Sequence, residues 1–338
     1  MINYVYQIVS PGVISIKYDE INFDDKVIVR PRFMALCHAD HRYYMGNRDI
    51  NVLRNKFPMA LIHECCGEVV FDSTKTYSPG QKVVMIPNVP PKTKQNEIYE
   101  NYAEGAGFLS SGHDGFMREF VSLSLDRVVP FENADARIAA IAEFISVGVH
   151  AVNRFKNTAH NIRNTVGIWG DGSLGYVLVC VLKKMLPETK LVVMGRDASK
   201  LSQFSFADEI YLTYEMPEDF RVDHAFECAG GEGSYFAIDD IIKYINPQGT
   251  TVLLGVSENK VAINTRDILE KGLTFVGSSR SGREDFKKAV ELLEQPDFQK
   301  KISRIVYQDE KVSSVKDIHR VFKTDLNNAF KTVFEWNL

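Results

Sequence analysis

Residues 165–182 read TVGIWGDGSLGYVLVCVL, and this stretch decides the fold. An apolar run of strand length ends in a glycine-rich turn, and an apolar run of helix length follows at once. In such a unit the pattern G-x-G-x-x-G binds the pyrophosphate of a dinucleotide, because the glycines allow close approach of the backbone and the helix N-terminus offers free N–H groups. The alternative, a plain tight turn, requires all three glycines by coincidence. The residues expected to contact the cofactor are Gly170, Gly172, Ser173, Leu174 and Gly175.

Strand-like and helix-like segments alternate on either side of this turn. The strand-like ones recur at residues 190–195, 222–230, 249–256 and 273–279. Such alternation builds a parallel, doubly wound α/β sheet, the Rossmann fold. Up to about residue 145, short β-rich runs punctuated by Pro and Gly predict a mainly β domain instead, and after residue 279 an amphipathic helix is expected at 283–294. We therefore predict a nucleotide-binding domain at 146–279, inserted into a β-rich catalytic domain at 1–145 and 280–338.

The second strand of the Rossmann segment ends without the acid that usually holds the adenosine ribose. Residues 191–200 read LVVMGRDASK, so the expected position of that Asp or Glu is taken by Gly195, with Arg196 after it. A carboxylate would repel a 2′-phosphate, whereas an arginine suits one, and Lys200 adds a second positive charge. The pattern therefore favours NADP(H) over NAD(H). A solvated arginine at a strand end is the alternative.

Composition excludes several other classes of protein. The chain has 338 residues, of which 45% are hydrophobic, and a net charge of −4 with a pI near 6.1 argues against nucleic acid as the main partner. The most apolar stretch, 138–152, contains Glu143 and His150, so no membrane span is expected. The first twelve residues show no secretion signal, and the five cysteines are then expected to be reduced thiols in the cytoplasm.

A metal site is suggested by Cys37 in LCHAD and His63 in IHECCG. A thiolate and an imidazole with nearby carboxylates suit Zn²⁺, and a catalytic zinc takes three protein ligands and keeps one position open. Glu143 is a further candidate, because a carboxylate among apolar residues is costly unless it is paired or bound to a metal. A buried cysteine, a hydrogen-bonded core histidine and a structural ion pair are the alternatives for these three residues.

Several motifs together resemble the zinc-containing medium-chain dehydrogenases/reductases over essentially the whole chain. They are LCHAD, IHECCGEVV, PGQKVV, EFISVGVHAV and GIWGDGSLG, in this order. The resemblance implies a GroES-like β domain beside the Rossmann domain, and homodimers are common in the family. It also implies that Cys37 and His63 bind the catalytic zinc with Asp40 behind them, and that Glu64 or Glu143 supplies the remaining oxygen.

Two departures from the family pattern matter. Residues 85–115, where many relatives hold a structural zinc with four cysteines, contain no cysteine, so we expect one zinc per chain. Ala39 stands where alcohol dehydrogenases have the Ser or Thr of the proton relay, so another group must take that role. His38, His41, Tyr43 and a water are candidates, and each of the three side chains could equally be a polar residue on an exposed loop.

Within the family, the chain most resembles the branch that acts on ribulose 5-phosphate, through residues 36–46, 108–121 and 272–286. This implies reduction of D-ribulose 5-phosphate to D-ribitol 5-phosphate by NADPH, with zinc polarising the C2 carbonyl. A cytidylyltransferase would then convert the product to CDP-ribitol for teichoic acid or capsule. For the substrate phosphate we favour Arg42 and Arg48, with Lys56, Arg280 and Arg283 also available.

Three other functions remain possible from the residues alone. The first is a zinc-dependent, NADP-linked polyol or alcohol dehydrogenase with an unphosphorylated substrate. The second is a zinc-free enoyl or quinone reductase on the same fold, against which the Cys37 and His63 pair argues. The third is a non-catalytic nucleotide sensor, which would not need the set of metal-binding side chains.

Overall fold

The computed structural model describes residues 2–93 and 98–338, and these form two compact units. Unit 1 comprises the chain up to Ser146 together with Ser281–Leu338, and unit 2 comprises Val147–Arg280. Each boundary lies one residue from the position expected from the sequence. The predicted fold class, a doubly wound parallel sheet beside a mainly β domain, is confirmed.

Unit 2 is built around a six-stranded sheet with the order β13-β12-β11-β14-β15-β16. All neighbouring strands are parallel, as expected for strand–helix–strand units. The strands are β11 (Thr165–Trp169), β12 (Lys190–Gly195), β13 (Glu209–Leu212), β14 (His224–Glu227), β15 (Thr250–Leu253) and β16 (Thr274–Gly277). Because β11 lies next to both β12 and β14, the glycine turn after it sits where the direction of winding reverses, which is where doubly wound sheets bind nucleotides.

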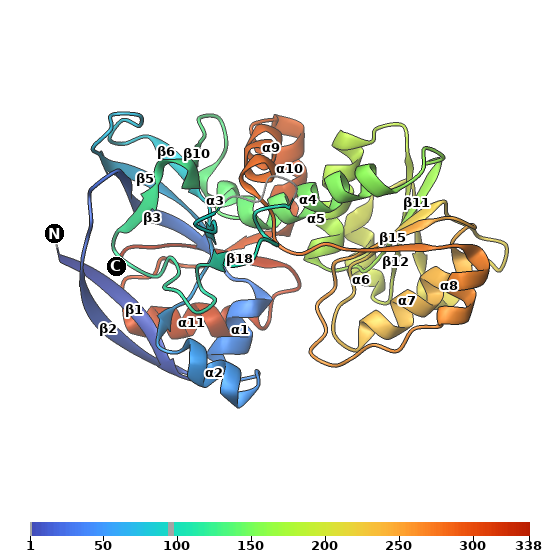
Figure 1. Cartoon of the computed structure of the whole chain (residues 1–338), viewed down its shortest axis with the longest axis horizontal. Helices are drawn as coiled ribbons and strands as arrows, with labels where there is room; N and C mark the ends of the chain where they lie inside the picture. The colour runs from blue at the N-terminus through green and yellow to red at the C-terminus, as the bar shows by residue number, and fades with distance from the viewer. Residues whose placement is uncertain (1, 94–97) are drawn as a thin grey trace. The chain divides into compact units, whose positions relative to one another are not determined.

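Helices flank this sheet (Figure 1). They are α4 (Ala142–Thr158), which runs across the unit boundary, α5 (Ser173–Met185), α6 (Ala198–Leu201), α7 (Gly233–Tyr244) and α8 (Thr265–Lys271), with 3₁₀ turns at Ser202–Phe204 and Thr213–Glu215. Every residue of α5 from Gly175 to Leu182 is buried, which explains why its sequence is apolar all round. The core between the sheet and α7 includes Trp169, Met194 and Ile241.

Unit 1 contains a larger, mainly antiparallel sheet and two small ones. The larger has the order β10-β6-β5-β3-β18-β17, with β9 also paired to β3, and the small ones have the orders β2-β1-β4 and β7-β8. The strands are β1 (Ile2–Ser10), β2 (Val13–Glu20), β3 (Lys26–Ala35), β4 (Met59–Ala60), β5 (Glu64–Asp72), β6 (Lys82–Met85), β7 (Asn88–Val89), β8 (Gly107–Phe108), β9 (Val121–Ser124), β10 (Val128–Pro130), β17 (Val306–Gln308) and β18 (Lys331–Glu335).

Unit 1 also contains helices (Figure 1). They are α1 (His38–Tyr44), α2 (Ile50–Lys56), α3 (Ala136–Ala139), α9 (Arg283–Leu293), α10 (Pro296–Ile302) and α11 (Val315–Asp325), with 3₁₀ turns at Leu125–Arg127 and Ser303–Ile305. Helix α9 is the amphipathic helix expected at 283–294. Across the part of the chain that the structure describes, no helix combines the length and the apolar character needed to cross a membrane.

Strand register in unit 1 brings distant segments together. In β3, Ala35 is opposite Glu64 of β5 on one side and opposite Val333 of β18 on the other. Residues just beyond these pairs therefore meet at one end of the sheet. The backbone N–H of Leu36 donates to the carbonyl of Thr332 at 3.1 Å, which continues the ladder on that side.

Buried His224 in unit 2 leads to the first prediction. It lies in β14 with its ring centroid 4.3 Å from that of His160, and its Nδ1 accepts the backbone N–H of Thr250 at 3.0 Å. Burial, helped by the charge of His160, lowers the pKa of His224 to about 4. Since the unfolded state then binds more protons between about pH 6.5 and pH 4, stability is lost as the pH falls through that window. We expect this residue to remove about 2 kcal/mol from the free energy of unfolding between pH 7 and pH 5.

Urea unfolding of the wild type and of His224→Gln at both pH values tests this expectation. Glutamine can accept the same bond from Thr250 but does not titrate, so the variant should lose less stability on acidification. Equal losses in the two proteins would show that His224 does not carry the effect.

Candidate metal centre and cofactor turn

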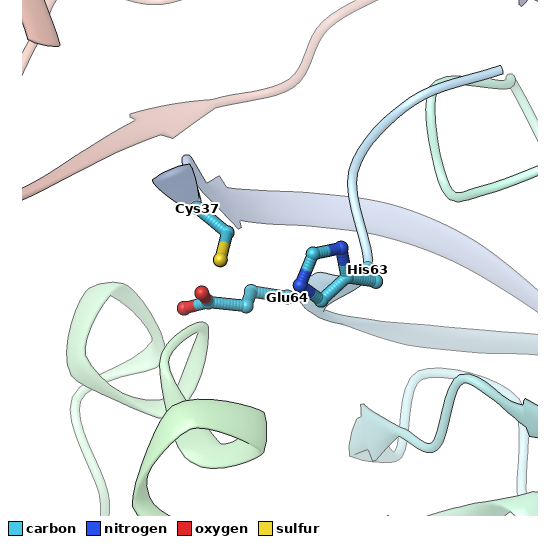
Figure 2. Close-up of side chains that lie close together, drawn as sticks. All are labelled: Cys37, His63 and Glu64. Carbon is cyan, nitrogen blue, oxygen red and sulfur yellow. The ribbon is translucent and has the colours of Figure 1, made fainter. Parts of the chain in front are cut away.

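Three of the predicted metal ligands converge at the shared end of β3 and β5. Cys37 follows β3 and caps the N-terminus of α1, His63 immediately precedes β5, and Glu64 is its first residue. One ligand atom from each of the three lies within 4.8 Å of the others. Figure 2 shows the sulfur, one ring nitrogen and the carboxylate pointing toward a common space. Soft sulfur, imidazole and carboxylate in this arrangement form the donor set that zinc prefers.

The buried carboxylate of Asp40 orients two of these ligands. Its Oδ2 accepts the backbone N–H of Cys37 at 3.1 Å, and its Oδ1 lies 3.6 Å from Nδ1 of His63 and accepts the hydroxyl of Ser110 at 2.9 Å. Burial opposes ionisation, but His63 and these hydrogen bonds hold the pKa of Asp40 below its usual value. With Nδ1 facing Asp40, the Nε2 of His63 is the nitrogen left to bind a metal, as is common for ligating histidines.

Glu64 forms an ion pair that the sequence alone did not indicate. Its Oε1 accepts from Nζ of Lys331 at 2.5 Å, and the same ammonium donates to the carbonyl of Leu36 at 2.7 Å and lies 4.5 Å from the ring centroid of Phe144. Both charged side chains are buried. The signal available in the sequence was a lysine at the start of an otherwise strand-like run, Lys331–Trp336.

The charge balance of this cluster favours a divalent cation. Burial, reinforced by the nearby charge of Glu143, raises the pKa of Glu64 to about 7 against the opposing pull of Lys331. The second oxygen of Glu64, Oε2, is buried and has no hydrogen-bond partner among the described residues. Two buried carboxylates, Glu64 and Glu143, lie near the place where the three ligand atoms meet, and a divalent cation bound there would stabilise their ionised forms. The residues present therefore fit a zinc ion.

Other residues predicted near the metal have different environments. Glu143 is buried near the start of α4 and acts on Glu64 through its charge. His38 is solvent-exposed on α1, but partial desolvation of its ring, followed by the charge of Arg42, lowers its pKa. The interpretation of His41 and Tyr43 as polar residues on an exposed loop is wrong, because both are buried in α1. The chain forms a helix there since Asp40 caps its first turn and the inward side chains pack against the core.

His41 and Tyr43 are held by specific partners. The Nε2 of His41 lies 2.6 Å from a carboxylate oxygen of Asp325, and the hydroxyl of Tyr43 accepts from Lys56. The guanidinium of Arg48 lies 4.5 Å from the ring centroid of Tyr43.

The glycine turn of unit 2 has the geometry of a dinucleotide cradle. A Cβ on Gly175 would lie 2.1 Å from the carbonyl oxygen of Gly170, and a Cβ on Gly170 would strike the backbone of Cys228, so neither position accepts a side chain. Around Gly172, by contrast, nothing lies within 4 Å of the place that a Cβ would take. This open space beside the first turn of α5 is what a pyrophosphate requires. The turn therefore fits the expected cofactor.

Gly195 has a neighbour that the sequence did not reveal. The carboxylate of Asp171, from the glycine turn, lies against it, and a Cβ on Gly195 would come within 2.6 Å of both Cβ and Oδ2 of Asp171. Oδ2 of Asp171 accepts the backbone N–H groups of Arg196 and Asp197 at 2.7 and 2.8 Å. Packing against Asp171 therefore requires a glycine at residue 195. This adds to the expectation that the position carries no negative charge near the phosphate of the cofactor. Only the fold, not the spacing in the sequence, reveals this contact.

Asp171 and Asp197 together occupy the backbone donors of this loop. Asp197 caps α6 by accepting the N–H groups of Ser199 and Lys200. A phosphate bound here must therefore be held mainly by side chains. Arg196 is exposed and Lys200 half-exposed, which leaves both cations accessible.

Comparison with known proteins identifies the family of the chain. A family model described as an alcohol dehydrogenase GroES-like domain matches residues 24–133, and one described as a zinc-binding dehydrogenase matches residues 204–295. The chain belongs to the zinc-binding, medium-chain dehydrogenase/reductase family.

Similarity extends to particular members of this family. The chain is 54% identical to a ribulose-5-phosphate reductase of Streptococcus pneumoniae, with 100% of this chain and 98% of the relative covered. It is 47% identical to ribulose-5-phosphate reductase 1 of Staphylococcus aureus, with 99% of each covered. The crystal structure of S. aureus TarJ in complex with NADPH superposes with a TM-score of 0.89 at 43% identity, covering 100% of both chains.

The Glu64–Lys331 pair gives a stability prediction for the metal-free protein. Because the folded-state pKa of Glu64 lies above its ordinary value of 4.5, the ionised form destabilises the fold as the pH rises. Replacing Lys331 with Met should raise that pKa further and lower the free energy of unfolding by about 3 kcal/mol at pH 8. At pH 6 the loss should be smaller, since Glu64 can then take up a proton.

Urea unfolding of chelator-treated Lys331→Met at pH 8 and pH 6 measures both losses. Lys331→Arg keeps a cation in place and should recover most of the stability at each pH. A loss in Lys331→Met that does not depend on pH would contradict the assigned pairing.

Proposed function

We propose that this chain reduces D-ribulose 5-phosphate to D-ribitol 5-phosphate with NADPH, as a zinc-dependent oxidoreductase. The observation that carries the proposal is the full-length identity of 44–54% to four ribulose-5-phosphate reductases. The Cys37, His63 and Glu64 cluster and the open glycine turn are the two sites that such a reaction needs.

The metal-binding residues have distinct roles in this proposal. Cys37 and His63 hold the zinc, and Glu64 or Glu143 provides the remaining oxygen. Once bound, the zinc acts as a Lewis acid that polarises the C2 carbonyl of the substrate. Asp40 keeps Cys37 and His63 in position through the contacts described above. Lys331 holds Glu64 and balances one of the buried carboxylates.

The proton that accompanies hydride transfer needs a route to the substrate oxygen. Asp40 is fully buried and already accepts three hydrogen bonds, so it serves as a positioning group. His38 is solvent-exposed, follows Cys37 directly in the sequence, and has a pKa that partial desolvation and the charge of Arg42 lower. A neutral imidazole can accept a proton on one nitrogen and release another, so we propose His38 as the relay.

Cofactor binding follows from unit 2. We propose that Gly170, Gly172 and Gly175 with Ser173 and Leu174 receive the pyrophosphate of NADPH, and that Arg196 and Lys200 bind its 2′-phosphate. Support comes from the open space at Gly172 and the accessibility of both cations. We propose one zinc per chain, because no cysteine occurs between Cys66 and Cys180.

The biological setting is also a proposal. A phosphorylated pentitol is a substrate for a cytidylyltransferase, which would make CDP-ribitol for teichoic acid or capsule in the cytoplasm. A homodimer is supported by exposed apolar side chains between β15 and the edge strand β16, namely Val256, Ile263 and Leu269.

An assay with purified, zinc-loaded protein tests the function. We expect NADPH oxidation with ribulose 5-phosphate at a kcat/KM at least about 100-fold above that with free ribulose, since a site built for a charged group discriminates strongly against its absence. Xylulose 5-phosphate serves as the stereochemical control. Comparable rates with ribulose and ribulose 5-phosphate would instead favour an NADP-linked polyol dehydrogenase.

Replacing Arg196 tests the cofactor assignment. Arg196→Ala should weaken NADPH binding about 10- to 100-fold, the worth of charge-assisted hydrogen bonds, and change NADH binding much less. Dissociation constants from nucleotide fluorescence measure both. Arg266→Ala, at an exposed arginine of the same unit, is the control and should alter neither. Equal weakening of both cofactors by Arg196→Ala would argue against a 2′-phosphate contact.

A further inference from the structure

A cluster of polar side chains in unit 1 includes two of the cations that the sequence offered for the substrate phosphate, Arg48 and Lys56. We call it the Lys56 cluster, and it consists of Tyr43, Arg48, Lys56 and Ser111. The ammonium of Lys56 donates to the hydroxyl of Tyr43 at 2.9 Å and to that of Ser111 at 2.8 Å. The guanidinium of Arg48 stacks on the Tyr43 ring with 4.5 Å to its centroid. Two cations thus converge on one buried phenol.

The ammonium of Lys56 is bonded to hydroxyl groups. Among the residues that the structure describes, no carboxylate lies within ion-pair distance of its ammonium, although the side chain is half-buried. The buried Lys331, by contrast, pairs with Glu64. A half-buried ammonium bonded only to neutral oxygens leaves the site positively charged and therefore suited to an anion.

The donors of this cluster are only partly used. An ammonium has three N–H groups, of which Lys56 gives one to Tyr43 and one to Ser111, so the third remains for a ligand. Burial of Tyr43 opposes its ionisation, yet the bond from Lys56 and the charge of Arg48 lower the pKa of this phenol, which makes it a stronger hydrogen-bond donor. Lys56 therefore offers a charged donor at a place where the guanidinium of Arg48 adds a second positive charge.

Asp40 connects the cluster to the metal-binding residues. Tyr43 is three residues after Asp40 in α1, so both side chains lie on the same helix face about 5 Å apart along the axis. Asp40 in turn lies 3.6 Å from His63. On the opposite side, Ser110 donates to Asp40 and the adjacent Ser111 accepts from Lys56. Two independent connections therefore place the cluster next to the zinc ligands.

We infer that the Lys56 cluster binds the phosphate monoester of the substrate, with Lys56 as its principal cation. The inference rests on the proposed function, in which the carbonyl at C2 is at the metal and the phosphate is on C5. Three carbon–carbon bonds and one ester oxygen separate these groups, so the phosphate site must lie in the neighbourhood of the metal ligands, to which Asp40 and Ser110 link the cluster. Arg48 contributes to binding of the phosphate, as expected from the sequence, while Lys56 makes the main contact.

Substituting Lys56 tests the inference against a purely structural role. The quantity to measure is the ratio of kcat/KM for ribulose 5-phosphate to that for ribulose, with zinc content and thermal unfolding recorded for each variant. Lys56→Met should lower this ratio about 10- to 100-fold, because it removes hydrogen bonds from a charged donor. Lys56→Arg retains the charge and should recover most of the ratio. Arg54→Met removes a cation from the exposed side of the same helix and should leave the ratio unchanged.

Each result decides between distinct conclusions. A selective fall in Lys56→Met supports the phosphate site, as does a rise of about 10-fold in the inhibition constant of inorganic phosphate against ribulose 5-phosphate. A parallel fall with both ketoses, which leaves the ratio unchanged, would mean that Lys56 only braces Tyr43 and Ser111, and would overturn the inference. If the wild type itself shows no preference for the phosphorylated ketose, the proposed function fails first.

Discussion

The antiparallel register of β3 with β5 and β18 is the constraint on which the metal centre depends. It sets Ala35 against Glu64 and Val333, so the chain segments that leave these pairs carry Cys37, His63 and Lys331 to the same end of the sheet. Side-chain direction in a strand alternates with a period of two, so a slip of one residue in either pairing would turn Glu64 or Lys331 to the opposite face. The hydrophobic core of unit 1 holds this register in place.

Buried charge makes that arrangement costly without a cation. Burial and the charge of Glu143 raise the pKa of Glu64, and the charges of Lys331 and His63 oppose this shift without cancelling it. The same helix, α1, starts at a metal ligand and ends at a phenol surrounded by cations, so negative and positive potential lie within a few turns of each other. A substrate with a polarisable carbonyl and a distant phosphate complements both.

The sequence predicted the periodic elements better than the contacts between distant side chains. The glycine turn, the parallel strands and the helix at 283–294 carry strong local signals, since strand and helix periodicity and turn chemistry act over a few residues. The sequence carries no such local signal for the partners of charged side chains. Lys331 meets Glu64 across a sequence separation of 267 residues, and Asp171 meets Arg196 only once β11 and β12 are paired, so neither contact has a spacing rule. The short helix α1 was missed for a similar reason, because its stability comes from packing rather than from propensity.

The contact between Asp171 and Gly195 couples two positions in a way that bears on coenzyme engineering. Installing an acid at residue 195, the obvious route to an NAD-dependent enzyme, would drive its Cβ into the carboxylate already present and set two negative charges against each other. Residue 171 would have to shrink or lose its charge first, and the loop would then lose the acceptor of two backbone N–H groups. Residues 171 and 195 can therefore change only together. A single substitution at residue 195 would fail for steric reasons, whatever the binding energy of the new coenzyme.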